Sequence, residues 1–314
     1  MLQLPANPAQ AGTAWHDTGV DQHRETAAPV PHGVGVTAVG TALARAVESR
    51  RPDRLFEDPF AEDFVAVAGQ ALLSGAAGWR TSRRRQDWRA SLGQSIAVRT
   101  RFYDDWALSA SAAGCRQVVL LGAGLDTRAF RLAWPQEPRL FELDLPDMLA
   151  FKQRVLDRRG AVPACRRVPV PVDLRDDWPA ALAEAGHRAG QPTAWLAEGL
   201  LVYLAQADND RLLDRIGRLS APGSRLALGH MSQQAVEALS ARREAPGDPV
   251  GGRLTALWRS GLAEDPAAWL DRHGWRARVH DPDELAARYG RPPAASTPGA
   301  PERPARWLIA AERR

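Results

Sequence analysis

From Gln117 onward, short apolar runs alternate with amphipathic stretches, and this alternation constrains the fold more than any other feature of the sequence. The first run, QVVLLGAG, is β-branched and aliphatic and ends in glycines, as is typical of a buried parallel strand. Such alternation predicts a doubly wound α/β fold, a parallel sheet with helices on both faces and ligands beyond the carboxyl ends of its strands. The five strand candidates are residues 117–124, 139–144, 166–174, 193–204 and 223–231, and the helices between them are expected from Thr127, over 146–159 and over 208–219.

The chain divides into three parts by composition and periodicity. Residues 1–33 are rich in Ala, Pro, Gly and polar residues without periodicity, which predicts a flexible arm. Residues 34–113 carry apolar residues at helical spacing, which predicts a helical N-terminal lid region packed on the core. Residues 114–314 are expected to form the core. In the second part, helices are expected over 37–50, 58–73 and about 89–111. In the third part, we expect a helical insert at about 232–273 that walls the substrate pocket and a helix over 283–289. The closing strands 275–281 and 306–313 are expected to pair like a hairpin at the sheet edge.

Composition bounds the class of protein. With 314 residues and 45% hydrophobic residues, the chain can bury a sizeable core. It lacks the roughly 18 uninterrupted apolar residues of a membrane span, and its first thirty residues do not resemble an export signal. The two cysteines, Cys115 and Cys165, suit neither a disulfide framework nor a metal site. We therefore expect a cytoplasmic protein without a metal and without a membrane partner.

The positive charge of the chain does not point to nucleic acid. The formal net charge is +4, but Lys152 is the only lysine and the basic residues are otherwise all arginine. The short run of arginines at 83–85 is not interleaved with a nucleic-acid motif, and surface arginines more often pair with carboxylates. No nucleic-acid partner is expected.

The first strand ends in the sequence Gly122-Ala123-Gly124-Leu125-Asp126-Thr127-Arg128. Glycines here let the backbone approach a ligand closely. A dinucleotide fingerprint would require a third glycine where Thr127 stands, which argues against a nicotinamide-dependent oxidoreductase. A tight turn without a ligand stays open as an alternative, with Asp126 acting only as a helix N-cap.

Acidic residues mark two further strand ends. Glu142 and Asp144 stand about 20 residues after the glycine turn, where such folds hydrogen-bond ribose hydroxyls, although either residue could instead be solvated or cap the helix at Pro146. Glu198 stands in an otherwise apolar segment, AWLAEGLLVYL. A lone buried carboxylate is costly, which favours a functional or ion-paired role. Tyr203, near the end of that segment, is either a weak catalytic candidate or core packing with a wet hydroxyl.

The strings GAGLDTRAFRL, FELDLPDMLAFK, VDLRDDW and AEGLLVYL, in this order and spacing, resemble the leucine carboxyl methyltransferase family and its bacterial relatives. The string TALARAVESRRPDRLFEDPFAEDF near the start does so too. The similarity covers about residues 34–230. It implies a seven-stranded class I methyltransferase (Rossmann-like) core whose last strand is antiparallel, and S-adenosyl-L-methionine as the cofactor.

The resemblance also implies roles for individual residues. The turn at Gly122, Ala123 and Gly124, with Asp126, lies under the methionine part of the cofactor. The acid matching Asp144 holds the ribose, with Leu145 beside it, and the pair matching Asp173 and Leu174 flanks the adenine. The acid matching Glu198 faces the methionine ammonium, and the arginine matching Arg99 pairs with its carboxylate. Arg101, in the neighbouring register, stays open for that role, and Arg45 is a weaker match to a further basic residue.

Physical reasoning agrees with these assignments, because an ammonium requires a carboxylate and bidentate arginine suits a carboxylate. Asp173 could alternatively cap a helix beginning at Trp178. Methyl transfer from a sulfonium needs chiefly alignment in a dry site, so a carboxylate acceptor needs no general base, whereas a phenol benefits from one. His230, after the fifth strand, is a weak candidate base; the alternative is a polar strand end.

The expected activity is O-methylation of a carboxylate or phenol on a small, polyketide-like metabolite of secondary metabolism. Methylation of a protein C-terminal carboxyl group is the alternative, and a cofactor-binding regulator without turnover is the alternative of another class. A monomer or a homodimer is expected. Four tryptophans are candidates for the acceptor pocket wall, although they equally suit a core: Trp79, Trp88, Trp258 and Trp269.

Overall fold

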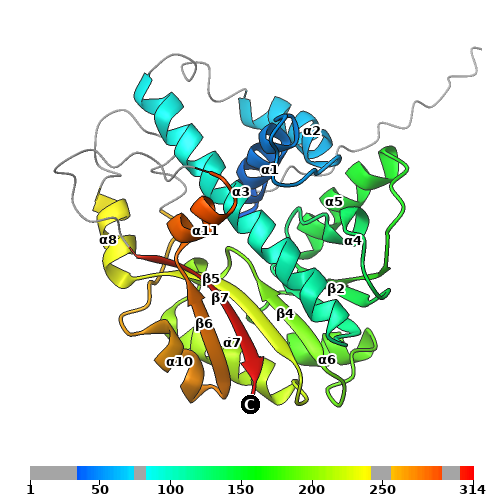
Figure 1. Cartoon of the computed structure of the whole chain (residues 1–314). Coiled ribbons are helices and arrows are strands. Elements are labelled where there is room, and N and C mark those ends of the chain that lie inside the picture. Colours follow the sequence, from blue (N-terminus) through cyan, green and yellow to red (C-terminus); the bar gives the residue numbers. More distant parts are fainter. Residues whose placement is uncertain (1–33, 74–82, 242–255, 292–304) are drawn as a thin grey trace, which may run out of the picture.

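The computed structural model describes residues 34–73, 83–241, 256–291 and 305–314, and these form an α/β fold around a seven-stranded sheet (Figure 1). The strand order is β3-β2-β1-β4-β5-β7-β6. This confirms the doubly wound architecture and the seven strands. The strands are β1 Gln117–Leu121, β2 Arg139–Asp144, β3 Arg166–Pro171, β4 Thr193–Ala197, β5 Arg225–Met231, β6 Trp275–His280 and β7 Arg306–Arg313.

The first five strands run parallel, and the last strand is antiparallel to both of its neighbours. β1 lies between β2 and β4, with Gln117 in register with Arg139 and with Thr193. β7 lies between β5 and β6 and is antiparallel to both. The expected closing pair of strands at the sheet edge is therefore confirmed.

Both faces of the sheet are buried under helices, which explains the continuous apolar runs. In β1, Val119 packs into one core cluster, and Val118 and Leu120 pack into another. The first cluster includes residues of α6 (Trp178–Glu184), α7 (Gln206–Arg218) and α10 (Pro266–Arg272). The second includes residues of α3 (Arg83–Ala112) and α11 (Pro282–Arg288) on the opposite face (Figure 1).

The N-terminal part of the described chain is helical, as predicted. It consists of α1 (Val34–Ser49), α2 (Ala61–Leu73) and the long helix α3. A buried ion pair between Arg45 and Asp58, 2.8 Å apart, fixes the segment between α1 and α2. α5 (Pro146–Arg158) shares a third core cluster with α1 and α2, so these helices lie beside the carboxyl ends of the strands.

Strand β4 is shorter than the apolar run 193–204 suggested. It ends at Ala197, and the chain turns at Glu198 and Gly199 into a short 3₁₀ helix, η1 (Leu201–Tyr203). Gly199 has φ +66°, a backbone conformation that a strand does not adopt. The turn therefore places Glu198 at a strand end, rather than inside the apolar strand. β3 similarly ends at Pro171, before residues 172–174.

The remaining expectations are met in part. The helix after the glycine turn is only α4 (Arg128–Arg131), and the insert after β5 contains α8 (Gln233–Ala241) and α10. Asp281 is the N-cap of α11, accepting hydrogen bonds from the backbone N–H of Asp283 and of Glu284. The predicted flexible arm 1–33 and the side chains of Trp79 and Trp88 lie outside the described residues.

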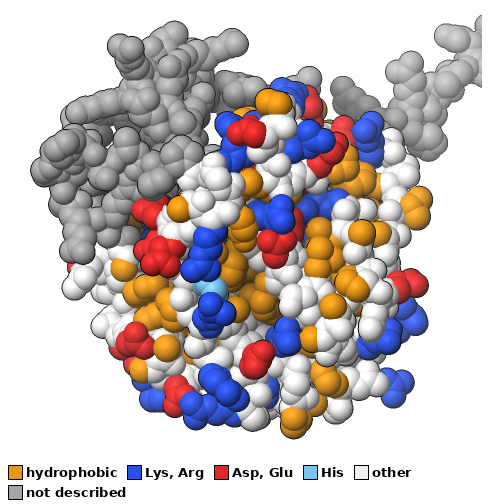
Figure 2. Space-filling model, in the orientation of Figure 1, with side chains coloured by type: hydrophobic (Ala, Val, Ile, Leu, Met, Phe, Trp, Pro, Cys, Tyr) orange, Lys and Arg blue, Asp and Glu red, His pale blue; other side chains and the backbone are white. Residues whose placement is uncertain are grey.

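The surface shows no gathering of one charge on the face in Figure 2, where acidic and basic side chains are interspersed. In the described ranges, no helix is long and apolar enough to cross a membrane. Within the same ranges no cluster of His, Cys, Asp or Glu suits a metal ion. Cys115 and Cys165 are buried free thiols.

Candidate functional site

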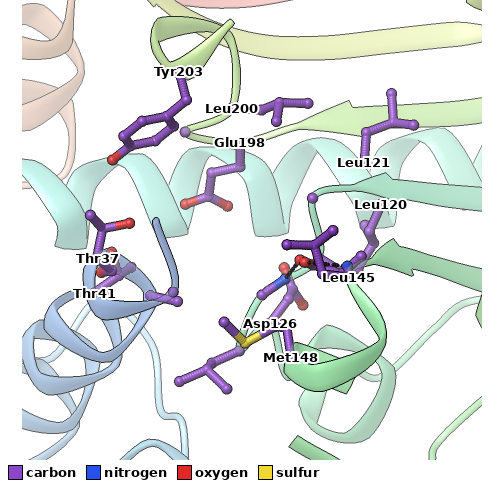
Figure 3. Close-up of a pocket in the computed structure, with 18 of the residues that line it drawn as sticks. Thr37, Thr41, Leu120, Leu121, Asp126, Leu145, Met148, Glu198, Leu200 and Tyr203 are labelled. Carbon is purple, nitrogen blue, oxygen red and sulfur yellow. Dashed lines mark hydrogen bonds between the residues drawn. The ribbon is translucent and has the colours of Figure 1, made fainter. Parts of the chain in front are cut away.

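A cavity of about 920 Å³ opens at the carboxyl ends of β1, β2 and β4 and is walled on one side by α1. This is the edge of the sheet at which the sequence predicts a ligand. In Figure 3 the Glu198 side chain points into a space bordered by Tyr203 and by Thr37 and Thr41 of α1, with Leu145 and Met148 across from them. The cavity brings together all the residues expected to bind the cofactor: Arg99, Gly122, Ala123, Gly124, Asp126, Asp144, Leu145, Asp173, Leu174 and Glu198.

The turn after β1 exposes backbone to the cavity. Gly122 has φ +65° and Gly124 has φ +47°, left-handed conformations that favour glycine. The backbone N–H of Gly124 donates to Oδ2 of Asp144 over 2.6 Å, which ties the turn to the end of the neighbouring strand. The two strand ends thus form a single floor for the cavity.

Asp144 is held as an acceptor at the cavity edge. Its Oδ1 accepts from the backbone N–H of Leu145 over 2.7 Å, in addition to the bond from Gly124. Burial raises the pKa of the Asp144 carboxyl, and the two backbone N–H groups only partly oppose that shift. A carboxylate fixed in this way can accept hydrogen bonds from neighbouring hydroxyls of a ligand.

Glu142 does not share this role, although it lies two residues earlier on the same strand. Its side chain is fully buried and makes ion pairs with Lys152 and with Arg167, each 2.9 Å long. It does not line the cavity, as the structure describes it. Of the two acids considered from the sequence, only Asp144 faces the ligand space.

Glu198 is ion-paired rather than alone. Its Oε1 accepts from Nε of Arg99 over 2.8 Å, and its Oε2 lies 2.9 Å from Nη1 of Arg128. Burial by itself would raise the pKa of the Glu198 carboxyl, but the guanidinium groups of Arg128 and Arg99 outweigh it and hold the pKa below its ordinary value. Glu198 is therefore ionised near neutral pH.

Arg128 is one of the cavity residues to which sequence reasoning gave no role. It is 2% exposed and contacts the carboxylates of Asp104, Asp126 and Glu198. Its Nε donates to Asp104 over 2.7 Å. The available signal was its place in the GLDTR string, but only the folded chain shows that it reaches Glu198.

Asp126 is not the N-cap of α4, a position that Thr127 occupies, so that alternative for Asp126 is wrong. Asp126 lines the cavity, and its Oδ1 accepts from the backbone N–H of Arg128 over 2.7 Å at the start of α4. Burial opposes its ionisation, yet the Arg128 guanidinium keeps the pKa of Asp126 below its ordinary value.

The structure separates Arg99 from Arg101. Arg99 lines the cavity, and among described partners only its Nε is hydrogen-bonded, to Glu198. Arg101 pairs instead with the exposed Asp105 on the same helix and does not line the described cavity. Arg45 reaches the cavity wall but is engaged with Asp58 and with the carbonyl of Leu125.

Asp173 and Leu174 lie at the far side of the cavity, after β3. Asp173 pairs with Arg175 over 2.5 Å, which lowers the pKa of its carboxyl. The N-cap of α6 is Asp177, which accepts from the backbone N–H of Ala180. Asp173 therefore does not cap that helix, and its carboxylate borders the ligand space.

His230 is not brought together with these residues. Alternation along β5 places it on the same face as Leu226 and Leu228, where its ring is 3% exposed and lies 5.8 Å from the Trp269 ring. Burial lowers the pKa of His230 to about 4. It is not among the described residues that line the cavity, so we assign it no catalytic role.

Tyr203 and Arg259 line one end of the cavity, and both come later in the chain than the glycine turn. Tyr203 lines it and also packs against the core cluster of Val202, so its catalytic role stays a prediction. Arg259 lines it too, and its backbone N–H donates to the Val202 carbonyl over 2.7 Å. Of the insert after β5, residues 256, 257 and 259 line this end. Trp258 packs instead beside Val202, and Trp269 is fully buried, so among described side chains these tryptophans belong to packing clusters.

This arrangement suits a zwitterion joined to a nucleoside. Glu198 offers an anionic acceptor for an ammonium, and the terminal nitrogens of Arg99 next to it can face a carboxylate. Asp144 offers acceptors for hydroxyls, and Leu145 and Met148 offer apolar surface beside it. The donors and acceptors therefore fit the parts of S-adenosyl-L-methionine.

Comparison with known proteins agrees with this chemistry. Residues 38–217 match the family described as leucine carboxyl methyltransferase. A protein of Streptomyces coelicolor is 48% identical over 262 residues, covering 83% of this chain and 90% of its own, and one of Parafrankia sp. is 50% identical over 268 residues, covering 85% and 84%. Both are provisionally named S-adenosyl-L-methionine-dependent methyltransferases.

The fold has a counterpart among solved structures. A duf574 family protein from Streptomyces avermitilis superposes with a TM-score of 0.55 at 17% identity, covering 88% of this chain and 97% of that one. At this identity the likeness shows the shared fold.

Proposed function

The chain belongs to the leucine carboxyl methyltransferase family and is an S-adenosyl-L-methionine-dependent methyltransferase, and from this premise we propose that it methylates an oxygen of a small metabolite, a carboxylate or a phenol. The fold class and the cofactor predicted from the sequence are thereby confirmed. The acceptor is the part that we propose.

The residues described above would hold the cofactor as follows. Glu198 binds the ammonium and Arg99 the carboxylate of its methionine part, and Asp144 accepts from the ribose hydroxyls. The turn from Gly122 to Gly124 runs beneath, and Asp173 borders the adenine side. The cofactor supplies an electrophilic methyl group on a positively charged sulfur.

The observation that carries the acceptor proposal is Arg259. Six arginines line the described part of the cavity: Arg45, Arg99, Arg128, Arg131, Arg175 and Arg259. The first five pair with carboxylates, whereas Arg259 makes no ion pair with any acid that the structure describes. It lies at the Tyr203 end of the cavity, since its backbone N–H donates to the Val202 carbonyl, and we place the acceptor there. A guanidinium at that position suits an acceptor that carries a negative charge.

The absence of a neutral base supports the same proposal. Among the described residues that line the cavity there is no histidine, lysine or cysteine. A carboxylate acceptor is already ionised at neutral pH and needs no base, whereas an ordinary phenol, with a pKa near 10, must lose a proton. Of the two acceptors, the carboxylate therefore needs less from this cavity, and the role of the protein is to align it in a dry site.

The test is methyl transfer from labelled cofactor into fractionated extracts. We expect label in the small-molecule fraction, and we expect alkali to release it as methanol if the product is a methyl ester, whereas an aryl methyl ether resists alkali. Arg259→Ala should abolish most transfer while retaining binding of S-adenosylhomocysteine, and Arg218→Ala, an exposed arginine on α7, serves as the matched control. Label confined to proteins, or label on nitrogen or carbon, would contradict the proposal.

A further inference from the structure

A second cavity, of about 510 Å³, lies at the amino-terminal ends of β1, β2 and β3, at the edge of the sheet opposite the methyltransferase cavity. Four arginines line it: Arg116, Arg139, Arg166 and Arg188. They come from four separate segments of the chain, and nothing in the methyl-transfer chemistry uses them.

The charge of this cavity is unbalanced. Glu137 is the single acid among its described lining residues. No ion pair joins any of the four arginines to an acid in the described part of the chain, in contrast to the paired arginines around Glu198. Like charges close together on neighbouring strands are destabilising unless something offsets them.

The arginines are held close together by the sheet itself. Arg139 is in register with Arg166 on β3 and with Gln117 on β1, which follows Arg116. The side chain of Gln117 fixes the loop that carries Arg188: its Oε1 accepts from the backbone N–H of Arg188 over 2.8 Å, and its Nε2 donates to the carbonyl over 3.0 Å. The backbone that carries the four arginine side chains is therefore fixed before any ligand binds.

Arg139 is the central residue of the cluster. Its Nη1 donates to the Gly186 carbonyl over 2.9 Å, while its Nε is buried without a hydrogen-bond partner in the described structure. A Cβ at Gly186 would lie 2.6 Å from Nη1, so only glycine permits this approach. Nη2 of Arg139 makes no hydrogen bond within the described residues, so it can donate to an acceptor on a bound anion.

We propose that this cavity binds a small oligophosphate group, as in inorganic diphosphate or triphosphate or the phosphate chain of a nucleotide. Planar guanidinium groups match phosphate oxygens in pairs, and several of them suit an anion with several charges. The concave shape, with a volume within the range of small-ligand pockets, favours a compact anion over a polymer that would need a long basic track. The site is independent of the cofactor cavity and of the acceptor proposed above.

The test is calorimetric titration of the full chain with sodium tripolyphosphate at physiological salt. Saturable binding with one site is expected. Arg166 and Arg188 are exposed, so the fold should tolerate their replacement. The double variant Arg166→Gln with Arg188→Gln should weaken binding of tripolyphosphate by about tenfold or more, given the strength of charge-assisted hydrogen bonds. Arg276→Gln with Arg278→Gln removes the same charge from exposed positions on β6 and should leave the affinity unchanged.

Two measurements keep the outcome clear. Affinity for S-adenosylhomocysteine should be equal in all three proteins, which shows that the variants are folded and separates this proposal from the methyltransferase assignment. Sodium sulfate at equal ionic strength should compete only weakly. The proposal is overturned if tripolyphosphate shows no saturable binding, if both double variants bind it like the unmodified protein, or if a single-stranded oligonucleotide binds the site more tightly than tripolyphosphate does.

Discussion

Nη1 of Arg128 lies 2.9 Å from Oε2 of Glu198, so the carboxylate that faces the cavity is held by the guanidinium of a residue that is only 2% exposed. Arg128 keeps Glu198 ionised against the burial that would raise its pKa. The proposed binding of an ammonium group by Glu198 therefore depends on Arg128, a buried residue of the cavity wall.

We predict that Arg128→Gln makes cofactor binding pH-dependent. Because the lost guanidinium no longer opposes burial, the pKa of Glu198 rises, and the affinity for S-adenosylhomocysteine should fall as the pH is lowered from about 8 to 6, by up to about tenfold per pH unit below the new pKa. Arg128→Lys retains the charge and should bind with little pH dependence, like the unmodified protein. Calorimetry across pH measures both.

The double variant Arg128→Gln with Glu198→Gln identifies the titrating group. It should bind S-adenosylhomocysteine weakly, and its affinity should not change with pH, because the carboxyl group that would take up the proton is gone. A dependence on pH that persists in the double variant would show that another group, such as Asp126 or Asp104, titrates instead.

Asp144→Asn should weaken binding of S-adenosylhomocysteine by about tenfold or more. The carboxylate now accepts hydrogen bonds from two backbone N–H groups, and the NH₂ group of an amide would face one of them as a second donor. Asp157→Asn, on the exposed face of α5, is the matched control and should bind normally. Equal affinity of the two variants would remove Asp144 from the site.

Buried histidines should make the free energy of unfolding fall as the pH drops. Burial lowers the pKa of His187 and of His230 to about 4, whereas an unfolded histidine titrates near 6.5. Between these values the unfolded chain binds protons that the folded chain does not, so stability is full above pH ~6.5 and is lost toward pH ~4, by roughly 2 kcal/mol per histidine between pH 7 and 5.

His230→Phe isolates one of these contributions. Urea unfolding at the two pH values should show a smaller loss in the variant than in the unmodified protein, and methyl transfer at neutral pH should be retained. An identical pH dependence, or a loss of transfer with the fold intact, would contradict the position we describe for His230.

Lys152→Met should destabilise the protein by about 3 kcal/mol or more, because it leaves Glu142 buried with only Arg167 as an ion partner. Adding Glu142→Gln should restore part of the loss, which denaturant unfolding would show. Arg276→Met, at an exposed position on β6, should change stability by no more than about 0.5 kcal/mol. If Lys152→Met changed the stability as little as this control does, the ion pair of Lys152 with Glu142 would not contribute to the free energy of unfolding.

The sequence predicted the sheet well where a strand is apolar on both faces and bounded by polar or turn residues. β2 spans residues 139–144 as expected, and β7 spans 306–313. The run 193–204 was ambiguous because the residues of η1, such as Leu201, are also buried in the core. Apolarity reports burial, and the end of β4 depends on the backbone conformation of Gly199, which hydrophobicity does not encode.

The site was predictable to the extent that its residues follow strand ends. The glycine turn, Asp144 and Glu198 meet because the carboxyl ends of parallel strands share one edge. Arg128 and Arg259 were not predicted. Arg128 matters because it forms ion pairs with acids from other elements, and Arg259 because it forms none within the described residues, and neither property is visible in the sequence. His230 also stands near a strand end, but its side chain alternates onto the opposite, covered face.

The most direct test of the account is calorimetry of the full chain with S-adenosylhomocysteine and with NAD, repeated with Glu198→Gln. We predict one-site binding of S-adenosylhomocysteine, no binding of NAD, and at least about tenfold weaker binding in the variant, whose thermal unfolding stays cooperative. Arg101→Ala, two residues beyond Arg99 on the same helix and outside the described cavity, should bind like the unmodified protein. Absence of S-adenosylhomocysteine binding, or unchanged affinity in Glu198→Gln, would contradict the assignment of this cavity.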